Sequence, residues 1–597
     1  MCGIGGWIGE GVARRGEPQV AAMMAAMRHR GPDDAGIWAG RGGNVVLGHN
    51  RLSIIDLSSA GHQPMINQAN GDVLVFNGEI YNFLELRREL ESQGFRFRSQ
   101  SDTEVLLVAL AAWGTGCLSR IEGMYAFAVW RPSENALYLV RDPTGIKPLY
   151  YWSPSGRDLV FASEIKAFFA LPGFAARLDR RALGQFLEFG YTFDAERTCL
   201  DGVRKLPPGH FIKVTPGHAA VEPTAFYRPK VLGPAPASAA DAEDQLYDSL
   251  CRVVGQHLIA DVPVGLLLSG GIDSSILAAL AARVTKVRTI SMGFANSAMD
   301  ERPHARRVAE HIGSDHEEVL LTPEEVQSGL SESIPVFDDL FADWGTVTTR
   351  ILYRKCRELG LKVALVGEGA DELFAGYGVF EAAAGAASGL PGAGTEWAHF
   401  QLYRRYASRR WGAFYPRFRA VMRELAAEVD GDLFETIRRF EATRQLPNNY
   451  VMKVDKASMS VSLEARAPYL DRRVAEIAFR TPREWLLRDG RNKHLLRCVA
   501  ERLRLLPPEI AGRPKMGGSI AATWLEEVPQ FQQFARETVL AADGFAGRLG
   551  LRPAMERFFD GRGGYPFPRS LSILGHLAWR LLLLELWSRH YLQERAA

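Results

Sequence analysis

The stretch "VGLLLSGGIDSSILAALAARV" (264–284) decides the fold of the second half of the chain. It begins with an apolar run of strand length, continues through a turn with two glycines and ends in a run of helical length. The runs "VRTISMGF" (287–294) and "KVALV" (362–366) are further apolar strands that end in loops. This alternation is typical of a parallel sheet with helices on both faces. The mainly helical pattern after about residue 380 predicts a helical C-terminal part.

The turn "SGGIDSS" (269–275) predicts an anion site. Glycines allow a ligand to approach the backbone closely, and the start of the following helix offers free N–H groups to an anion. Ser269, Ser274 and Ser275 add hydroxyl donors. The glycine spacing and the lysine of a Walker A loop are missing. The turn instead resembles the pyrophosphate loop of ATP pyrophosphatases, with Asp273 at its acidic position, although a capped helix start is the simpler alternative.

A second loop, "GEGADE" (367–372), places three carboxylates after the neighbouring strand. Open α/β sheets bind ligands at the carboxyl ends of their strands, so Glu368, Asp371 and Glu372 are expected beside the first loop. Carboxylates beside a triphosphate would repel it without a cation between them. Asp273 and Asp371 are therefore the predicted Mg²⁺ ligands.

The first half of the chain has a different texture. Short β-type runs, separated by turn signals and interrupted by two helical patterns, predict a layered α+β domain over residues 2–205. Proline, alanine and small polar residues over 206–245 are typical of a linker. The second domain is expected over 246–597.

The start "MCGIGGW" (1–7) indicates a nucleophile. If Met1 is removed, which a small side chain at position two favours, Cys2 carries both a thiol and a free α-amine that can act as its base. Such a site needs an oxyanion hole, and "FNGEIYN" (76–82) offers the Asn77 side chain and the Gly78 backbone N–H. This is the logic of an N-terminal nucleophile hydrolase.

Three charged residues of the first half are candidates for holding an amino-acid substrate. Arg51 can pair with a carboxylate in a bidentate manner, and Glu79 and Asp102 can hold an ammonium. Taken singly, Arg51 is more typical of a surface or structural arginine and Asp102 of a helix cap. Their joint appearance behind the start "MCG" favours the substrate-binding interpretation.

Composition excludes several other classes. The chain has 597 residues, is 47% hydrophobic and 23% charged, and carries a formal net charge of +2, so it has no bias towards nucleic acid. Its six cysteines are scattered, which is typical of a reduced cytoplasmic protein. The start lacks the basic region of a signal peptide, and the apolar run 571–587 contains charged residues that predict a buried helix rather than a membrane span.

Eleven motifs in order give the chain a specific resemblance that covers nearly its whole length. They are "MCGI", "RHRGPDD", "RLSIIDL", "FNGEIYN", "SDTEVLL", "RDPTGIKPLYY", "SGGIDSS", "GEGADELFAGY", "KVDKASMSVSLEARAPYLD", "KHLLR" and "RPKMGG". On these motifs the chain resembles the glutamine-hydrolysing asparagine synthetase B family. The resemblance implies an αββα N-terminal nucleophile glutaminase domain followed by an α/β ATP-pyrophosphatase-like synthetase domain.

The resemblance also implies the roles of particular residues. Cys2 attacks the glutamine carboxamide, and Asn77 and Gly78 form the oxyanion hole. Residues implied to bind glutamine are Arg51, Leu52, Ser53, Ile54, Ile55, Asn77, Gly78, Glu79 and Asp102. Residues implied to bind ATP are Leu267, Ser269, Gly270, Gly271, Asp273, Ser274, Ser275, Met292, Val366 and Gly367. Glu368 matches the glutamate tied to the acyl-adenylate, and Lys493 matches a lysine that closes on ATP and this intermediate.

Ammonia from glutamine would attack the adenylated acceptor after passing through a protein-lined tunnel. The expected acceptor is L-aspartate, which gives L-asparagine, AMP and pyrophosphate. The expected partners are small-molecule substrates and a second copy of the chain in a homodimer, without nucleic acid or membrane.

Two stretches depart from the family pattern and leave an alternative acceptor open. Val366 replaces a serine before "GEG", and Leu340, Trp344 and Gly345 replace a proline and a small polar pair near the acceptor side. A tryptophan there fits stacking on a sugar ring, so a uronic acid of surface polysaccharide or natural-product biosynthesis is the alternative acceptor. It fits a packing residue equally well. The intact cysteine and phosphate loops argue against an ATP-dependent cyclase and against a non-catalytic scaffold.

Overall fold

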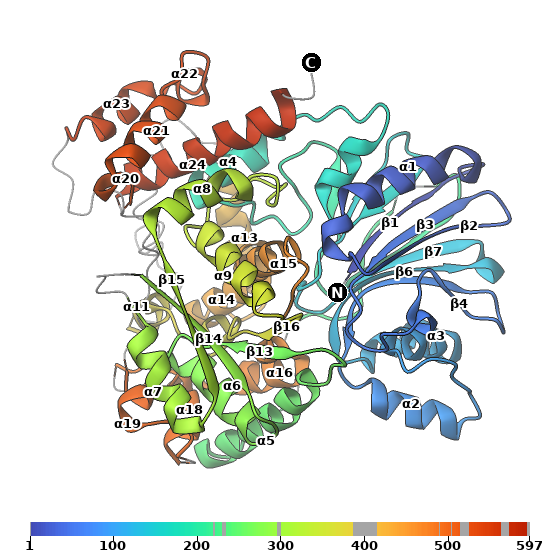
Figure 1. Cartoon of the computed structure of the whole chain (residues 1–597), viewed down its shortest axis with the longest axis horizontal. Coiled ribbons are helices and arrows are strands. Elements are labelled where there is room, and N and C mark those ends of the chain that lie inside the picture. Colours follow the sequence, from blue (N-terminus) through green and yellow to red (C-terminus); the bar gives the residue numbers. More distant parts are fainter. Residues whose placement is uncertain are drawn as a thin grey trace.

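The computed structural model describes residues 2–218, 221–229, 234–294, 300–385, 415–488, 490–502, 504–513, 524–562 and 572–593. Two antiparallel sheets form the first half of the chain, on the right of Figure 1. In spatial order the first contains β10 (Val203–Lys205), β8 (Tyr150–Trp152), β9 (Leu159–Ala162), β1 (Cys2–Ile8), β3 (Val45–Arg51) and β2 (Asp34–Ala39). The second contains β12 (Thr224–Ala225), β11 (His210–Val214), β7 (Ala136–Arg141), β6 (Gly123–Arg131), β5 (Val73–Ile80) and β4 (Met65–Ile66).

Alternating apolar residues bring the two sheets face to face. Ile4 and Leu47 of the first sheet share one buried cluster with Val75 and Leu139 of the second. Helix α1 (Ala13–Ala26) covers the outer face of the first sheet, and α2 (Phe83–Ser92) and α3 (Asp102–Trp113) cover that of the second. The predicted αββα layering is confirmed.

The segment 206–245 contains regular structure. Strand β11 pairs with β7 and carries β12 on its other side, so both strands extend the second sheet. Helix α5 (Ala239–His257) begins within the segment, with Ser238 as its N-cap.

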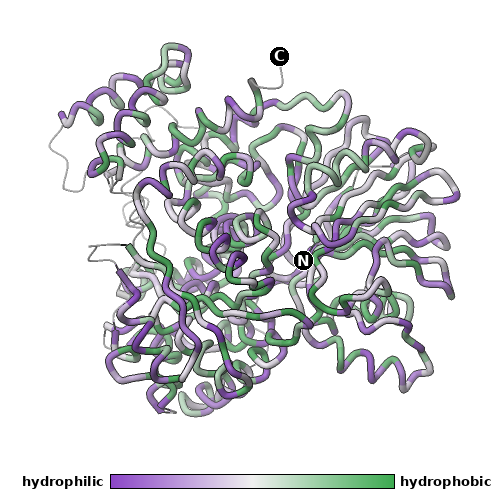
Figure 2. The backbone as a smooth tube through the Cα atoms, viewed as in Figure 1, coloured by the Kyte–Doolittle hydropathy of each residue, from purple (hydrophilic) through white to green (hydrophobic). Residues whose placement is uncertain are grey.

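A parallel sheet forms the centre of the second half. Its strands are β15 (Asp315–Leu321), β14 (Arg288–Phe294), β13 (Val264–Leu267), β16 (Val363–Leu365) and β17 (Glu464–Arg466). All neighbouring pairs are parallel, which confirms the predicted α/β fold. Hydrophobic stretches run along the strands of both halves, whereas the outer helices alternate between hydrophobic and hydrophilic stretches (Figure 2).

Helices surround this sheet and continue to the end of the described chain, as predicted. Those nearest the sheet are α6 (Ile272–Ala282), α7 (Arg302–Ile312), α8 (Pro323–Ser333), α9 (Thr346–Glu358), α10 (Ala370–Leu373) and α11 (Gly378–Gly385). The next group is α13 (Tyr415–Ala427), α14 (Leu433–Phe440), α15 (Val451–Met459), α16 (Arg472–Arg480), α17 (Arg483–Leu486), α18 (His494–Arg502) and α19 (Pro508–Ala511). The last group is α20 (Trp524–Glu527), α21 (Pro529–Val539), α22 (Phe545–Arg548), α23 (Arg552–Phe559) and α24 (Ile573–Ser588).

Helix α24 is the apolar helix that was expected to be buried. Leu581, Leu582 and Leu584 are fully buried on it, and Arg580 donates to the carbonyl groups of Leu187 and Glu188 at the end of α4 (Arg180–Phe189). Over the described ranges, no helix combines the length and the apolar character that a membrane crossing requires.

Candidate active sites

Cys2 lies at the start of β1, next to the boundary between the two halves. Its side chain is buried, and its backbone N–H donates to Oδ1 of Asn77 at 3.0 Å. Burial raises the pKa of the thiol, against a backbone hydrogen bond from Leu52 and the charge of Arg51. The neighbouring strands β1 and β3 place Cys2 opposite Arg51. Met1 lies outside the described residues.

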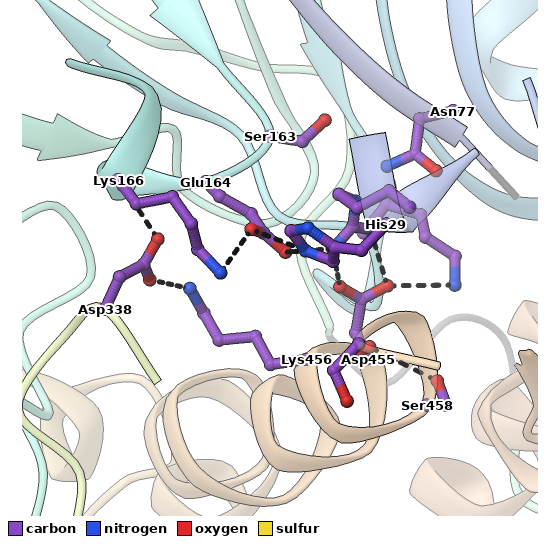
Figure 3. Close-up of polar contacts among 12 residues, drawn as sticks. His29, Asn77, Ser163, Glu164, Lys166, Asp338, Asp455, Lys456 and Ser458 are labelled. Atoms are coloured by element: carbon purple, nitrogen blue, oxygen red, sulfur yellow. Dashed lines mark hydrogen bonds and ion pairs between the residues drawn. The ribbon is translucent and has the colours of Figure 1, made fainter. Parts of the chain in front are cut away.

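Asn77 provides a polarised donor that is not used within the described part of the chain. The residue is fully buried on β5, and its Nδ2 atom has no hydrogen-bond partner there. Figure 3 shows the Asn77 side chain above the cluster of charged residues around His29 and Asp455. Gly78 follows, and a Cβ at this position would lie 2.2 Å from the carbonyl oxygen of Met124, so no larger residue fits. An unpaired buried amide next to a thiol suits a ligand oxygen.

Two carboxylates close to Asn77 are also buried: Glu79 on β5 and Asp102 at the start of α3. Oδ2 of Asp102 accepts the backbone N–H of Ile80 at 3.0 Å, and burial raises the pKa of Asp102 to about 6. Burial also raises the pKa of Glu79 well above its usual range, although Nη2 of Arg466 lies 3.2 Å from its Oε1. Arg466 belongs to β17 of the second half. The sequence did not indicate this contact.

Arg51 is engaged with its own loop. Its Nη1 atom donates to the Ser58 carbonyl at 2.8 Å, and its Nη2 atom donates to the carbonyl of Asp56. A Cβ on Gly61 would lie 2.0 Å from Nη2, so the loop closes tightly over the guanidinium. The four residues after Arg51 connect β3 to this loop; three are buried and Ile55 is half-buried. Arg51 therefore shapes the predicted glutamine segment, because its guanidinium already binds main-chain carbonyls.

Buried ion pairs join the two halves next to Cys2. Nε of Arg30 donates to the Cys2 carbonyl at 3.0 Å, and Nη1 lies 2.9 Å from both Glu164 and Asp455. Asp455 is on α15 of the second half and also lies 3.4 Å from Lys147. Figure 3 shows this cluster, in which Lys456 of the same helix pairs with Asp338. Unpaired charges would be costly here, so the pairs fix α15 against the first half.

The second site is built on the loop between β13 and α6. The hydroxyls of Ser269 and Ser274 lie 3.1 Å apart, and the Gly271 N–H donates to the Ser269 hydroxyl at 3.2 Å. Gly270 has a φ of 72°, and a Cβ there would lie 2.6 Å from the backbone of Ala305. Ser275 is fully buried. The predicted strand, glycine turn and helix are confirmed.

Lys493 bridges the two loops. Its Nζ atom lies 2.5 Å from Oδ2 of Asp273 and 2.7 Å from Oδ1 of Asp371. The two carboxylates raise the pKa of Lys493 against the opposing effect of burial. Gly376 packs behind this group, where a Cβ would lie 2.3 Å from Cε of Lys493. The residues after Arg513 in the "RPKMGG" motif lie outside the described residues.

A cavity of about 330 Å³ opens above these loops. Of the predicted ATP residues, it is lined by Leu267, Ser269, Asp273, Ser274, Met292, Val366 and Gly367. Glu368, Asp371 and Glu372 line it too, and burial raises the pKa of Glu368. Gly270, Gly271 and Ser275 lie in the loop beneath it. Sequence reasoning missed the lining residues Leu268, Ile290, Glu301, Leu352, Gly369, Tyr377 and Tyr450, of which Tyr450 comes from the helical part.

The unusual tryptophan of the acceptor segment is a packing residue. Trp344 stacks on Trp579 of α24 with ring centroids 4.5 Å apart, and its Nε1 atom donates to Nδ1 of His576 at 3.2 Å. Leu340 is buried in the same core. This arrangement removes the observation that suggested a sugar-binding wall.

The sequence comparisons agree with these two centres. Residues 1–227 match the family model of a glutamine amidotransferase domain, and residues 245–589 match that of asparagine synthase. The fold and the sites thus define a glutamine amidotransferase joined to a nucleotide-binding synthetase domain. The chain belongs to the asparagine synthase family.

Curated relatives extend over most of the chain. A putative glutamine-hydrolysing asparagine synthetase of Mycobacterium tuberculosis (strain ATCC 25618 / H37Rv) is 32% identical and covers 98% of this chain and 97% of its own length. Asparagine synthetase 1 of Bacillus subtilis (strain 168) is 31% identical over 84% of this chain and 83% of its own. Asparagine synthetase B of Escherichia coli (strain K12) is 28% identical over 85% and 80%.

Proposed function

We propose that the protein is a glutamine-dependent, ATP-consuming ligase that converts L-aspartate to L-asparagine. The observation that carries this proposal is the pairing of a buried Cys2–Asn77 centre with a glycine- and serine-lined cavity in one chain. The names of the relatives support the choice of aspartate. The domains are proposed as residues 2–205 and 246–597, with a linker over 206–245 that adds β11 and β12 to the second sheet and ends in the start of α5.

In the first centre, Cys2 would attack the carboxamide carbon of glutamine. This step requires that Met1 has been removed, so that Cys2 carries a free α-amine. The thiol proton would pass to this amine and then to the leaving ammonia. Nδ2 of Asn77 and the Gly78 N–H would stabilise the oxyanion. Asp102 and Glu79 would hold the substrate ammonium. Water then hydrolyses the thioester.

In the second centre, the loop 269–275 would hold the pyrophosphate part of ATP. The acceptor carboxylate attacks the α-phosphate, and pyrophosphate leaves. Lys493 would offset the negative charge that develops in this step, with Glu368 next to the acyl-adenylate. Ammonia then attacks the acyl carbon, AMP leaves and the amide forms.

Asp273 and Asp371 fit a Mg²⁺ ion. Both carboxylates line the cavity and offer hard oxygen ligands, and the Lys493 ammonium lies between them in this structure. Bound Mg²⁺ would supply further positive charge to the phosphate oxygens. The MgATP complex is thus the proposed form of the nucleotide.

We also propose that the enzyme works in the cytoplasm as a homodimer with small-molecule substrates and without nucleic acid. All six cysteines are free, which fits a reducing compartment. Analytical ultracentrifugation tests the dimer.

Incubation with ATP, Mg²⁺, glutamine and L-aspartate tests the function. We expect equal amounts of pyrophosphate, AMP and asparagine. Pyrophosphate release with a sugar uronate but not with aspartate would overturn the choice of acceptor. No pyrophosphate with either acid would overturn the ligase reaction itself.

A further inference from the structure

A second lysine, besides Lys493, lies close to residues that line the cavity. Lys453 is in the first turn of α15, three residues after Tyr450, which lines the cavity. Its Nζ atom lies 5.6 Å from the centroid of the Tyr450 ring. The charge of Lys453 also acts on Glu368, another lining residue, against the effect of burial on the Glu368 pKa. Lys453 is therefore a neighbour of two lining residues, Tyr450 and Glu368, behind the wall of the cavity.

The acceptor segment holds this ammonium in place. Oδ1 of Asp343 lies 3.0 Å from Nζ of Lys453, and the same oxygen accepts the Gly345 N–H at 2.8 Å. A Cβ on Gly345 would be in ordinary van der Waals contact with Nζ, at 3.5 Å, so Gly345 lies directly beside the ammonium. Within the described ranges, Asp343 is the one hydrogen-bond acceptor of Lys453. An ammonium has three donors, so donors are available for a ligand.

The charges of the cavity explain why a cation is needed here. Five carboxylates line it, namely those of Asp273, Glu301, Glu368, Asp371 and Glu372. Lys493 is already shared by two of them. An acceptor with two carboxylates would be repelled unless a further positive charge faces it.

Building on the proposed function, we propose that Lys453, positioned by Asp343, binds the acceptor carboxylate that is not adenylated. The acceptor is thereby a short dicarboxylic acid with one reacting and one anchored carboxylate. Lys493 serves the nucleotide end of the same cavity, so the two lysines divide the anionic substrates between them.

Substrate analogues test this assignment. β-Alanine is aspartate without its α-carboxylate, so it keeps the reacting carboxylate and the amine. Pyrophosphate release is measured with ammonium as nitrogen source for wild type, Lys453→Met, Lys453→Arg and the control Lys355→Met. Lys355 makes a comparable pair with Glu358 on the exposed side of α9.

We expect Lys453→Met to raise KM for aspartate by about 10- to 100-fold, since a charge-assisted hydrogen bond is lost. KM for ATP and the glutaminase rate should stay within about twofold of wild type. The preference of Lys453→Met for aspartate over β-alanine should shrink by the same factor. Lys453→Arg should keep most of the wild-type preference. Lys355→Met should change none of these values.

Equal losses of kcat/KM for aspartate and β-alanine, or a lower kcat at unchanged KM, would overturn the assignment. If Lys453→Met does not accumulate as folded protein, Asp343→Asn gives the same test: it should raise KM for aspartate severalfold and leave KM for β-alanine unchanged. A wild-type enzyme that releases no pyrophosphate with aspartate would instead show that the proposed function is wrong.

Discussion

The surroundings of Cys2 and those of Lys493 differ in how much open space they contain. At the first centre, Cys2, Asn77, Glu79 and Asp102 are all buried, and one amide donor is left for a ligand. At the second, a cavity of about 330 Å³ is open, and Lys493 is held by two carboxylates. The side chains of the first centre are packed inside the protein. At the second centre, the Lys493 ammonium lies between Asp273 and Asp371, next to the cavity proposed to bind the nucleotide.

This difference assigns separate tasks to the two halves. A packed centre suits one small substrate and protects a thioester from unwanted reactions. An open cavity suits the entry of two anionic substrates and the release of AMP and pyrophosphate. Variants that disable one centre should leave the other largely intact, and the following predictions test that separation.

The largest effect is expected for Cys2→Ala. Glutamine-dependent amide formation should fall by about 10,000-fold or more, because the nucleophile is removed. Ammonium-dependent synthesis should stay within about twofold of wild type. Amide formation with either nitrogen source measures both rates. If both rates vanish in a variant with native circular dichroism and thermal stability, the two centres are not separable.

Lys493→Met should have the converse effect. Pyrophosphate release should fall by about 1,000-fold, because a preorganised charge at the phosphates is lost and the ammonium between the carboxylates of Asp273 and Asp371 is removed. Glutaminase activity, measured as glutamate release, should persist. Lys355→Met is the matched control and should behave as wild type. A full synthetase rate in Lys493→Met would contradict the role given to Lys493.

Asn77→Ala tests the oxyanion donor inside the packed centre. We expect kcat of glutamine hydrolysis to fall by about 100- to 1,000-fold with little change in KM. Asn77→Asp keeps an oxygen opposite the Cys2 N–H but lacks the amide donor, so it should lose at least as much. A normal rate in Asn77→Asp would show that the amide donor is not used. Ammonium-dependent synthesis is the internal control.

The smallest effect is expected from pH. Burial raises the pKa of Asp102 to about 6, so its carboxylate is charged above this pH and neutral below it. If the charged form holds the glutamine ammonium, KM for glutamine should rise by about tenfold from pH 7 to pH 5. Asp102→Asn should have a high KM that no longer depends on pH over this range. A wild-type KM that stays constant from pH 7 to pH 5 would exclude this role for Asp102.

The sequence predicts local units well. The strand, glycine turn and helix around 269–275 are adjacent in the chain, and their periodicities identify β13 and α6. Cys2 and Asn77 are 75 residues apart, and no sequence periodicity links them. Their proximity was predicted because a nucleophilic thiol needs an oxyanion hole and Asn77 can supply a donor.

Contacts between distant elements were not predictable in the same way. Tyr450 reaches the cavity from the end of a π-helical segment (Glu441–Tyr450), an irregularity that has no clear sequence signal. The Arg466–Glu79 contact depends on how two domains dock. For Trp344 the sequence permits either sugar stacking or packing, and its stacking on Trp579 of α24 shows that it is a packing residue.

The ion pair between Arg30 and Asp455 has a consequence for protein synthesis. The two residues are 425 positions apart, and at roughly 5–20 residues per second the ribosome makes the second about 20 to 85 seconds after the first. During that interval Arg30 has Glu164 of its own half as a partner but not yet Asp455. Until α15 is made, the surface around Arg30 must stay hydrated or be bound by a chaperone. An isolated first half would keep this surface exposed permanently.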